Sequence, residues 1–121
     1  VKDMSSRENY LRAIYELTEE GEDTTSTSEL SDRLGVSPAS VTEAIKKLED
    51  DSLVCRKAYK GFTLSPIGKE KASKMEKKKR TLEEFFRKIG AEDPEEEADM
   101  VEHAVSEDAV DRIRSEILDD S

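Results

Sequence analysis

Two helices joined by a very short turn are the feature that most limits how this chain folds. The first, over 28–34, ends at Gly35, a residue that suits the left-handed cap of a helix. The second begins at Ser37 and Pro38, because serine caps backbone N–H groups and proline fits the first helical position. A turn this short, with its glycine, predicts a helix-turn-helix unit. The apolar positions of the second helix recur at helical spacing: Val41, Ala44, Ile45 and Leu48.

A helix and a hairpin are predicted on either side of this unit. The helix covers 8–17, where apolar residues again recur at helical spacing, and Ser5 or Ser6 is its predicted N-cap. The segment 53–64 has two short apolar stretches separated by Tyr59-Lys60-Gly61, which predicts a β-hairpin with a glycine turn.

The rest of the chain is predicted to be helical. Ser65 and Pro66 open a long helix that extends to about Gly90, and Pro94 and Ser106 each open one more. The candidate buried positions of the long helix are Ile67, Met75, Leu82, Phe85, Phe86 and Ile89. The order helix, helix-turn-helix, hairpin, long helix is that of a winged helix, so we infer DNA binding. We predict a mainly α protein, with a winged helix-turn-helix domain over 1–72 followed by an all-helical domain over 73–121.

Charge is distributed unevenly along the chain. The net charge of −10 by itself opposes binding to phosphates. Residues 1–64 carry −4 and residues 65–90 carry +5, whereas residues 91–121 carry 2 basic and 13 acidic side chains, or −11. The acidity therefore lies at the C-terminal end and is compatible with DNA binding elsewhere.

The composition excludes several classes of protein. Hydrophobic residues make up 34% of the chain and charged residues 41%, which indicates a lean core and favours an oligomer. No run approaches the roughly 18 apolar residues that span a bilayer, and we find no apolar stretch of a signal peptide. The single cysteine, Cys55, excludes an internal disulfide framework and is expected to pack in the hairpin. We therefore predict a cytoplasmic protein with no membrane partner.

The start of the second helix of the unit is predicted to lie in the major groove of DNA. The residues expected to meet DNA there are Ser37, Pro38, Ala39, Ser40, Thr42 and Glu43. None of them is Arg, Asn or Gln, the residues that make strong bidentate contacts with bases, so we expect much of the recognition to depend on DNA shape and backbone. Phosphate contacts are predicted for Lys46, Lys47, Lys57 and Lys60.

One acidic stretch has the composition of a metal site. Asp99, Glu102 and His103 stand at i, i+3 and i+4 and so share a face of the predicted helix. Two carboxylates and an imidazole suit Mn²⁺, Fe²⁺, Co²⁺ or Zn²⁺, although such a group is also common as surface decoration. His103 is the only histidine in the chain.

The sequence resembles the diphtheria toxin repressor and manganese transport regulator family of metal-dependent transcription regulators. The matching stretches are 8–17 (ENYLRAIYEL), 34–42 (LGVSPASVT), 59–64 (YKGFTL), 82–86 (LEEFF) and 102–106 (EHAVS). The resemblance implies a homodimer built through the helices after about residue 75, with each subunit binding half of a palindromic operator. It also implies the shorter, two-domain form of the family. The expected dimer-interface residues are Phe85, Phe86, Ile89 and Val101.

The resemblance also implies a set of metal ligands, transferred residue by residue. Those residues are Asn9, Asp99, Glu102, His103, Glu83 and Glu95. Glu102 and His103 match the family outright, whereas Asp99 stands where members have Glu or Cys, and Asn9 where they have Asp or Met. Glu83 and Glu95 fall at positions of an ancillary site. Oxygen and nitrogen donors without sulfur favour Mn²⁺ or Fe²⁺ as the cofactor.

Two basic residues depart from the family pattern and leave two interpretations open. Lys79 falls where a histidine ligand is expected, and Arg12 replaces a glutamate ligand. Either a reduced site still binds one metal, or these two cations replace the charge of the metal and hold an active conformation without it. We favour the first interpretation because Asp99, Glu102 and His103 are all present.

The leading hypothesis is a metal-dependent repressor of metal homeostasis genes, activated by Mn²⁺ or Fe²⁺. Metal that bridges the first helix and the helix near residue 100 is expected to set the spacing of the two recognition helices. The alternative is a constitutive, metal-independent winged-helix regulator in which Lys79 and Arg12 replace the charge of the metal. An enzyme is the third hypothesis, and we expect neither catalysis nor a small-molecule substrate, because the sequence has no glycine-rich phosphate loop and no nucleophile–base pair.

Overall fold

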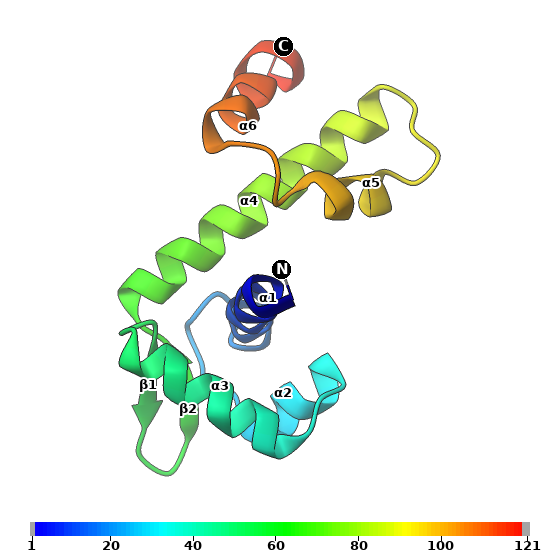
Figure 1. The fold of residues 1–121 in the computed structure, drawn as a ribbon. Helices are drawn as coiled ribbons and strands as arrows, with labels where there is room; N and C mark the ends of the chain where they lie inside the picture. The colour runs from blue at the N-terminus through cyan, green and yellow to red at the C-terminus, as the bar shows by residue number, and fades with distance from the viewer. Residues whose placement is uncertain (1, 120–121) are drawn as a thin grey trace. The chain divides into compact units, whose positions relative to one another are not determined.

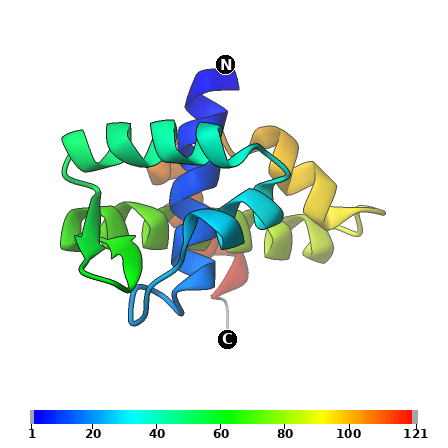
Figure 2. The same ribbon diagram turned by 90° about the horizontal axis from the view of Figure 1, so that it is seen from below.

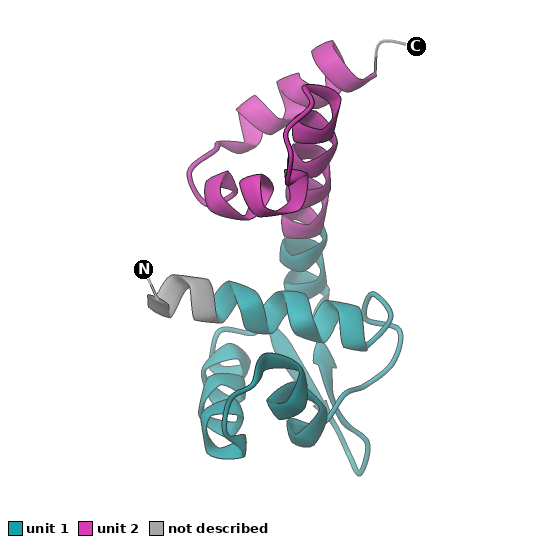
Figure 3. Ribbon diagram, turned by 90° about the vertical axis from the view of Figure 1, so that its right-hand side faces the viewer, with its two compact units in different colours: residues 1–73 teal, residues 74–121 magenta. Residues whose placement is uncertain are grey.

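The structure, a computed structural model, describes the backbone of residues 2–119 and the side chains of residues 7–119. It divides into unit 1, residues 1–73, and unit 2, residues 74–121, so the division falls inside the longest helix (Figure 3). Its elements are α1 (Lys2–Leu17), α2 (Thr27–Leu34), α3 (Pro38–Asp50), β1 (Val54–Lys57), β2 (Gly61–Leu64), α4 (Pro66–Lys88), α5 (Pro94–Val101), α6 (Glu107–Ile113) and the π-helical turn η1 (Arg114–Leu118) (Figure 1). The mainly α class and the winged-helix order are confirmed.

The helix-turn-helix is fixed by caps at each end of its turn. Ser26 and Glu29 form a capping box at the start of α2, in which the Ser26 hydroxyl oxygen accepts from the Glu29 N–H at 3.1 Å. Gly35 ends α2 with φ 67°, a left-handed conformation that favours glycine. Ser37 then caps α3 by accepting from the Ser40 N–H at 3.1 Å. The sequence signals therefore act as expected, although α2 begins at Thr27.

The hairpin β1–β2, which we call the wing, is bonded near its turn to the loop before α2. The strands pair antiparallel, with Val54 opposite Leu64 and Lys57 opposite Gly61. On the other edge of β2, Thr25 and Phe62 exchange two backbone hydrogen bonds, at 2.9 and 3.0 Å. A Cβ on Gly61 would lie 2.2 Å from the Thr25 carbonyl oxygen, so only glycine permits this close approach.

Unit 1 has an extensive apolar core. α1 packs against α2 and β2, and α3 packs against α2 and β1. In Figures 1 and 2, α2, α3 and the wing all lie on one side of α1. The fully buried side chains include Ile14, Leu30, Val41, Ile45 and Leu53. Tyr10 of α1 is also buried, and this burial raises the pKa of its phenol above the ordinary value because the charged form loses its hydration.

Unit 2 has a small core. Leu82, Ala98 and Val110, from α4, α5 and α6, form a buried cluster, against which Phe86, Val101, Val105 and Ile113 pack while partly exposed. A polar contact links η1 to α4, since Arg114 donates to the Thr81 hydroxyl oxygen at 2.9 Å and pairs with Glu84 at 2.6 Å. Because Thr81 is buried, this contact holds the end of the chain on α4.

Several expectations from the sequence differ from the structure. α1 begins at Lys2, so Ser5 and Ser6 lie within the helix and do not cap it. Ile67 and Ile89 were expected to be buried but are 55% and 61% exposed, because no described element covers their faces of α4. Across residues 2–119, no helix has the length and apolar character needed to cross a membrane.

Candidate functional site

The residues predicted to contact DNA form an exposed surface on unit 1. Val41, Ile45 and Leu48 of α3 turn into the core, which leaves the opposite face of the helix to solvent. All ten predicted residues are exposed: Ser37, Pro38, Ala39, Ser40, Thr42, Glu43, Lys46, Lys47, Lys57 and Lys60. α3 thus presents small and polar side chains in its first turns and lysines after them.

Hydrogen bonds within α3 limit what its exposed side chains can offer to DNA. The Ser37 hydroxyl oxygen is used as the helix cap, and the Thr42 hydroxyl donates to the Pro38 carbonyl oxygen at 3.1 Å. Thr42 therefore retains an acceptor but has its donor engaged. Glu43 lies 3.9 Å from Lys47, one helical turn away, in a pair that is 75% exposed on both sides and therefore weak.

The wing carries the second group of basic side chains. Lys57 ends β1 and Lys60 precedes β2, and both are exposed. Arg56, which sequence reasoning did not select, pairs with Glu49 of α3 at 3.0 Å. This ion pair joins the wing to the recognition helix within one unit.

Three of the predicted metal ligands, Asp99, Glu102 and His103, lie at or just after the end of α5. The helix ends at Val101, Glu102 is its C-cap, and the Ala104 and Val105 N–H groups both donate to the Val101 carbonyl oxygen. Glu102 is only 5% exposed, whereas Asp99 and His103 are exposed. The described residues contain no group of three or more His, Cys, Asp or Glu side chains arranged to hold a metal ion.

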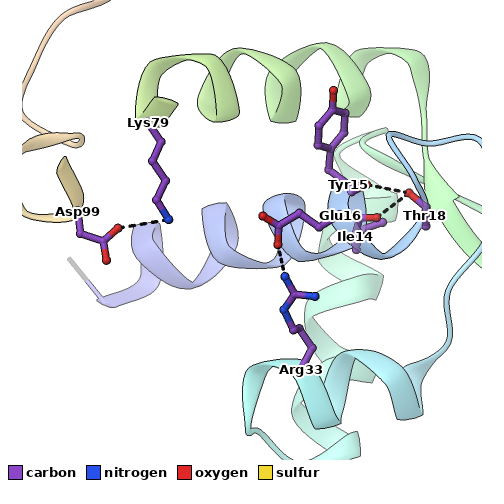
Figure 4. A network of polar contacts seen from close by, with 7 residues as sticks. All are labelled: Ile14, Tyr15, Glu16, Thr18, Arg33, Lys79 and Asp99. Carbon is purple, nitrogen blue, oxygen red and sulfur yellow. Dashed lines mark hydrogen bonds and ion pairs between the residues drawn. The ribbon is translucent and has the colours of Figure 1, made fainter. Parts of the chain in front are cut away.

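Lys79 forms an ion pair with Asp99, one of the predicted metal ligands. Its Nζ lies 3.6 Å from the Asp99 Oδ1, with side-chain exposures of 28% and 63% (Figure 4). The donor set of two carboxylates and one imidazole fits Mn²⁺ or Fe²⁺ chemically. The ammonium beside Asp99 shows that this carboxylate already accepts a positive partner, and a metal would have to compete for it.

The remaining predicted ligands are distributed over both units. Asn9 is exposed on α1, and Arg12 on the same helix is half-buried. Glu83 is half-buried on α4 of unit 2, and Glu95 is exposed in the first turn of α5. Their roles as ligands, or in the case of Arg12 as a replacement for one, stay predictions from the sequence.

The predicted dimer-interface residues form a partly exposed apolar set on unit 2. The rings of Phe85 and Phe86 meet edge to face with centroids 5.3 Å apart, and both are half-buried. Val101 is also half-buried, and Ile89 is exposed. The Arg114–Thr81 hydrogen bond, also in unit 2, joins residues 33 positions apart, so no local sequence pattern could have indicated it.

Two family models match the chain in succession. "Iron dependent repressor, N-terminal DNA binding domain" matches residues 3–62. "Iron dependent repressor, metal binding and dimerisation domain" matches residues 65–119. The chain belongs to the iron-dependent repressor family. The resemblance found in the sequence is confirmed, and this repressor carries both a domain that binds DNA and a domain that binds metal and dimerises.

Individual relatives agree with the family models. The HTH-type transcriptional regulator MntR of Bacillus pumilus (strain SAFR-032) is 33% identical over 110 residues, which are 89% of this repressor and 76% of that protein. The structure of ScaR with bound Zn²⁺ has a TM-score of 0.78 at 32% identity, covering 89% of this chain and 51% of that one. A manganese-dependent transcriptional repressor in complex with manganese has a TM-score of 0.74 at 33% identity, with coverage of 89% and 50%. The chain thus spans about half the length of these solved repressors.

Proposed function

We propose that this protein is a metal-activated transcriptional repressor of metal homeostasis genes, with Mn²⁺ or Fe²⁺ as its cofactor. It binds a palindromic operator as a homodimer, through the winged helix-turn-helix domain of residues 1–72, and dimerises through residues 73–121. The observation that carries the proposal is the pairing, in one chain, of an exposed recognition helix with carboxylate and imidazole donors. Its named relatives include manganese-dependent and MntR-type regulators.

The proposed metal ligands in unit 2 are Asp99, Glu102 and His103. When bound, the metal supplies positive charge to a segment that carries 13 acidic and 2 basic side chains beyond residue 90. Lys79 holds Asp99 in the absence of that charge. We propose that Lys79 lowers metal affinity in this way rather than replacing the metal.

The protein is proposed to act in the cytoplasm, together with its DNA, and to have no catalytic activity. Its family consists of DNA-binding regulators, and DNA is the partner for which the exposed face of α3 is suited. No small-molecule substrate is proposed.

The test is a DNA titration repeated in chelator, Mn²⁺, Fe²⁺ and Zn²⁺. The probe is a duplex selected from a random library with the wild-type protein in the presence of Mn²⁺. We expect at least roughly tenfold tighter binding in Mn²⁺ or Fe²⁺ than in chelator, within the usual range of coupling between two sites. Equal affinities in chelator and metal would overturn metal activation and support the constitutive alternative.

A second measurement separates metal binding from its effect on DNA. Equilibrium dialysis of the protein without DNA is expected to show bound Mn²⁺, and His103→Gln is expected to bind less of it. Metal binding without a change in DNA affinity would retain the site but overturn its role as an activator.

A further inference from the structure

Tyr59, at the tip of the wing, is the most exposed large apolar side chain among the described residues. Its relative exposure is 107%, so it contacts almost nothing in its own chain. Its backbone has φ 63°, in the left-handed region that favours glycine. In both respects tyrosine is an unfavourable choice for a turn, because glycine would form it without strain and without placing a ring in water.

The wing holds the backbone of Tyr59 in a defined place. The Lys60 N–H donates to the Lys57 carbonyl oxygen at 3.0 Å and closes the turn beneath Tyr59. Below the turn, β2 is bonded to Thr25 on its outer edge, and Arg56 of β1 pairs with Glu49 of α3. The ring therefore projects from a braced hairpin that is fixed to the recognition helix within unit 1.

The charged residues next to Tyr59 in the sequence indicate which kind of partner would contact its ring. Lys57, at the end of β1, and Lys60, in the turn, flank it in the sequence, and both are exposed. An exposed ring flanked in the sequence by two exposed lysines suits a partner that offers apolar surface between anionic groups. Duplex DNA is such a partner, because deoxyribose lies between successive phosphates along each strand.

We propose that Tyr59 is a DNA-contacting residue, whose ring packs on the deoxyribose wall of the groove next to the one that α3 enters. Lys57 and Lys60 neutralise the phosphates on either side of the ring. The inference rests on the DNA-binding part of the proposed function and is independent of the metal. It also gives the wing a contact that does not depend on salt, in a protein whose α3 has no Arg, Asn or Gln to contact bases.

The first test uses the absence of tryptophan from the sequence. Tyr59→Trp places a single fluorophore at the tip of the wing, and Ile67→Trp places one at an exposed position of α4 as the control. With the selected duplex, we expect the emission of Tyr59→Trp to change and its quenching by acrylamide to decrease, whereas Ile67→Trp changes little. An unchanged Tyr59→Trp signal at saturating DNA would overturn the contact.

The second test compares variants at Tyr59 with one at Lys60. Tyr59→Gly is expected to keep or raise the thermal midpoint, since it relieves the left-handed strain, yet to weaken DNA binding about fivefold or more through loss of apolar contact. Tyr59→Phe keeps the ring and is expected to bind nearly as well as the wild type. The salt dependence of binding should stay unchanged in Tyr59→Gly but fall by about one phosphate in Lys60→Ala.

These outcomes separate the inference from the function on which it rests. If Lys60→Ala weakens DNA binding and Tyr59→Gly does not, the Tyr59 contact is wrong while DNA binding through the wing stands. If the wild type selects and binds no duplex in any metal, both are overturned.

Discussion

The two units of the molecule solve the problem of burying apolar surface differently. Among the described residues, thirteen of the sixteen buried apolar side chains belong to unit 1 and three to unit 2. Unit 1 completes its core within one chain. Unit 2 encloses only Leu82, Ala98 and Val110, and leaves Ile89 and Met100 more than 60% exposed. A segment with so little core is expected to gain stability from a second copy, in agreement with its match to a dimerisation domain.

Charge separates the two units in the same direction. Unit 1 carries 11 basic and 14 acidic side chains, or −3, and unit 2 carries 9 basic and 16 acidic ones, or −7. The unit with the smaller core thus bears the larger self-repulsion, which a cation would relieve. From this comparison we expect unit 1 to be stable alone, and unit 2 to gain stability from a partner chain and from a bound cation.

The largest effect is expected on dimerisation, when a charge is placed on the exposed apolar surface of unit 2. Ile89→Lys should weaken the dimer by about one to two orders of magnitude, because burial of an isoleucine side chain contributes roughly 1.5–3 kcal/mol. Ile67→Lys is the matched control, with the same change at a similarly exposed position of unit 1. Sedimentation equilibrium measures both. A wild type that is strictly monomeric at micromolar concentration, or equal effects of the two variants, would contradict the comparison.

The next effect concerns the metal dependence of unit 2. Glu102→Gln removes a charged donor with little change of shape, and should lower Mn²⁺ affinity on the order of tenfold or more. It should also lower the metal-dependent part of DNA affinity. Glu96→Gln, an exposed acid of the same helix, is the control and should have a small effect. Calorimetry measures the Mn²⁺ affinity of both variants. An equal loss of affinity would indicate that the net negative charge of the segment attracts Mn²⁺, without a specific site at Glu102.

Changes at Lys79 should act in the opposite direction. Lys79→Met removes the ammonium 3.6 Å from Asp99, and we expect Mn²⁺ affinity to rise about three- to tenfold. Lys79→His should raise it further by adding a donor. Lys77→Met removes an exposed charge two positions away and is expected to change affinity much less. If Lys79→Met lowered metal affinity, Lys79 would be supporting the site and our assignment would be wrong.

A smaller effect distinguishes two kinds of residue on unit 1. Lys46→Ala and Lys60→Ala should each weaken binding to all duplexes by about two- to threefold and reduce the salt dependence by about one phosphate. Thr42→Ala and Glu43→Ala should instead alter the preference among duplexes. Lysine variants that shift sequence preference and leave the salt dependence unchanged would reverse these roles.

The smallest effect is a difference in alkaline stability. Burial raises the pKa of Tyr10, so the neutral phenol is favoured in the folded state. This contribution is fully present below the ordinary pKa of 10.0 and is lost as pH rises through the raised value, since the unfolded chain ionises first. Tyr10→Phe should therefore flatten the loss of stability of unit 1 above about pH 10. Denaturant unfolding at several pH values measures the free energy of unfolding. If this free energy falls equally steeply with pH in the wild type and the variant, the effect is excluded.

Local signals in the sequence determined most of unit 1. Ser37, Pro38 and Gly35 act through their own backbone neighbours, so the ends of α2 and α3 followed from residue type. The exposed face of α3 followed from the periodicity of its apolar residues in the same way. Contacts between segments far apart in the sequence could not be predicted from residue type or periodicity. The Thr25–Phe62 bridge and the Arg56–Glu49 pair join residues with no shared pattern, and only the fold brings them together.

The candidate metal site shows the same limit. Spacing placed Asp99, Glu102 and His103 on one helical face, but α5 ends at Val101 and Glu102 is buried while its two neighbours are exposed. Sequence comparison gave the position of Lys79, and only the structure gave its ion pair with Asp99. The exposure of Ile89 also lies beyond sequence patterns, because helical periodicity does not state whether a covering partner comes from the same chain.

The bridge between Thr25 and Phe62, close to the turn of the wing, has a consequence for redesign of this protein. Because the Thr25 backbone bonds to Phe62 and leaves no room for a side chain on Gly61, position 61 at the start of β2 is expected to accept only glycine. The turn above it, residues 58–60, is held by one backbone hydrogen bond and is exposed. The residues of the turn can therefore be exchanged more freely than Gly61 beside it. Because we assign Tyr59 and Lys60 to sugar and phosphate contacts, libraries restricted to these three positions are expected to change the overall strength of DNA binding more than the preference among operators.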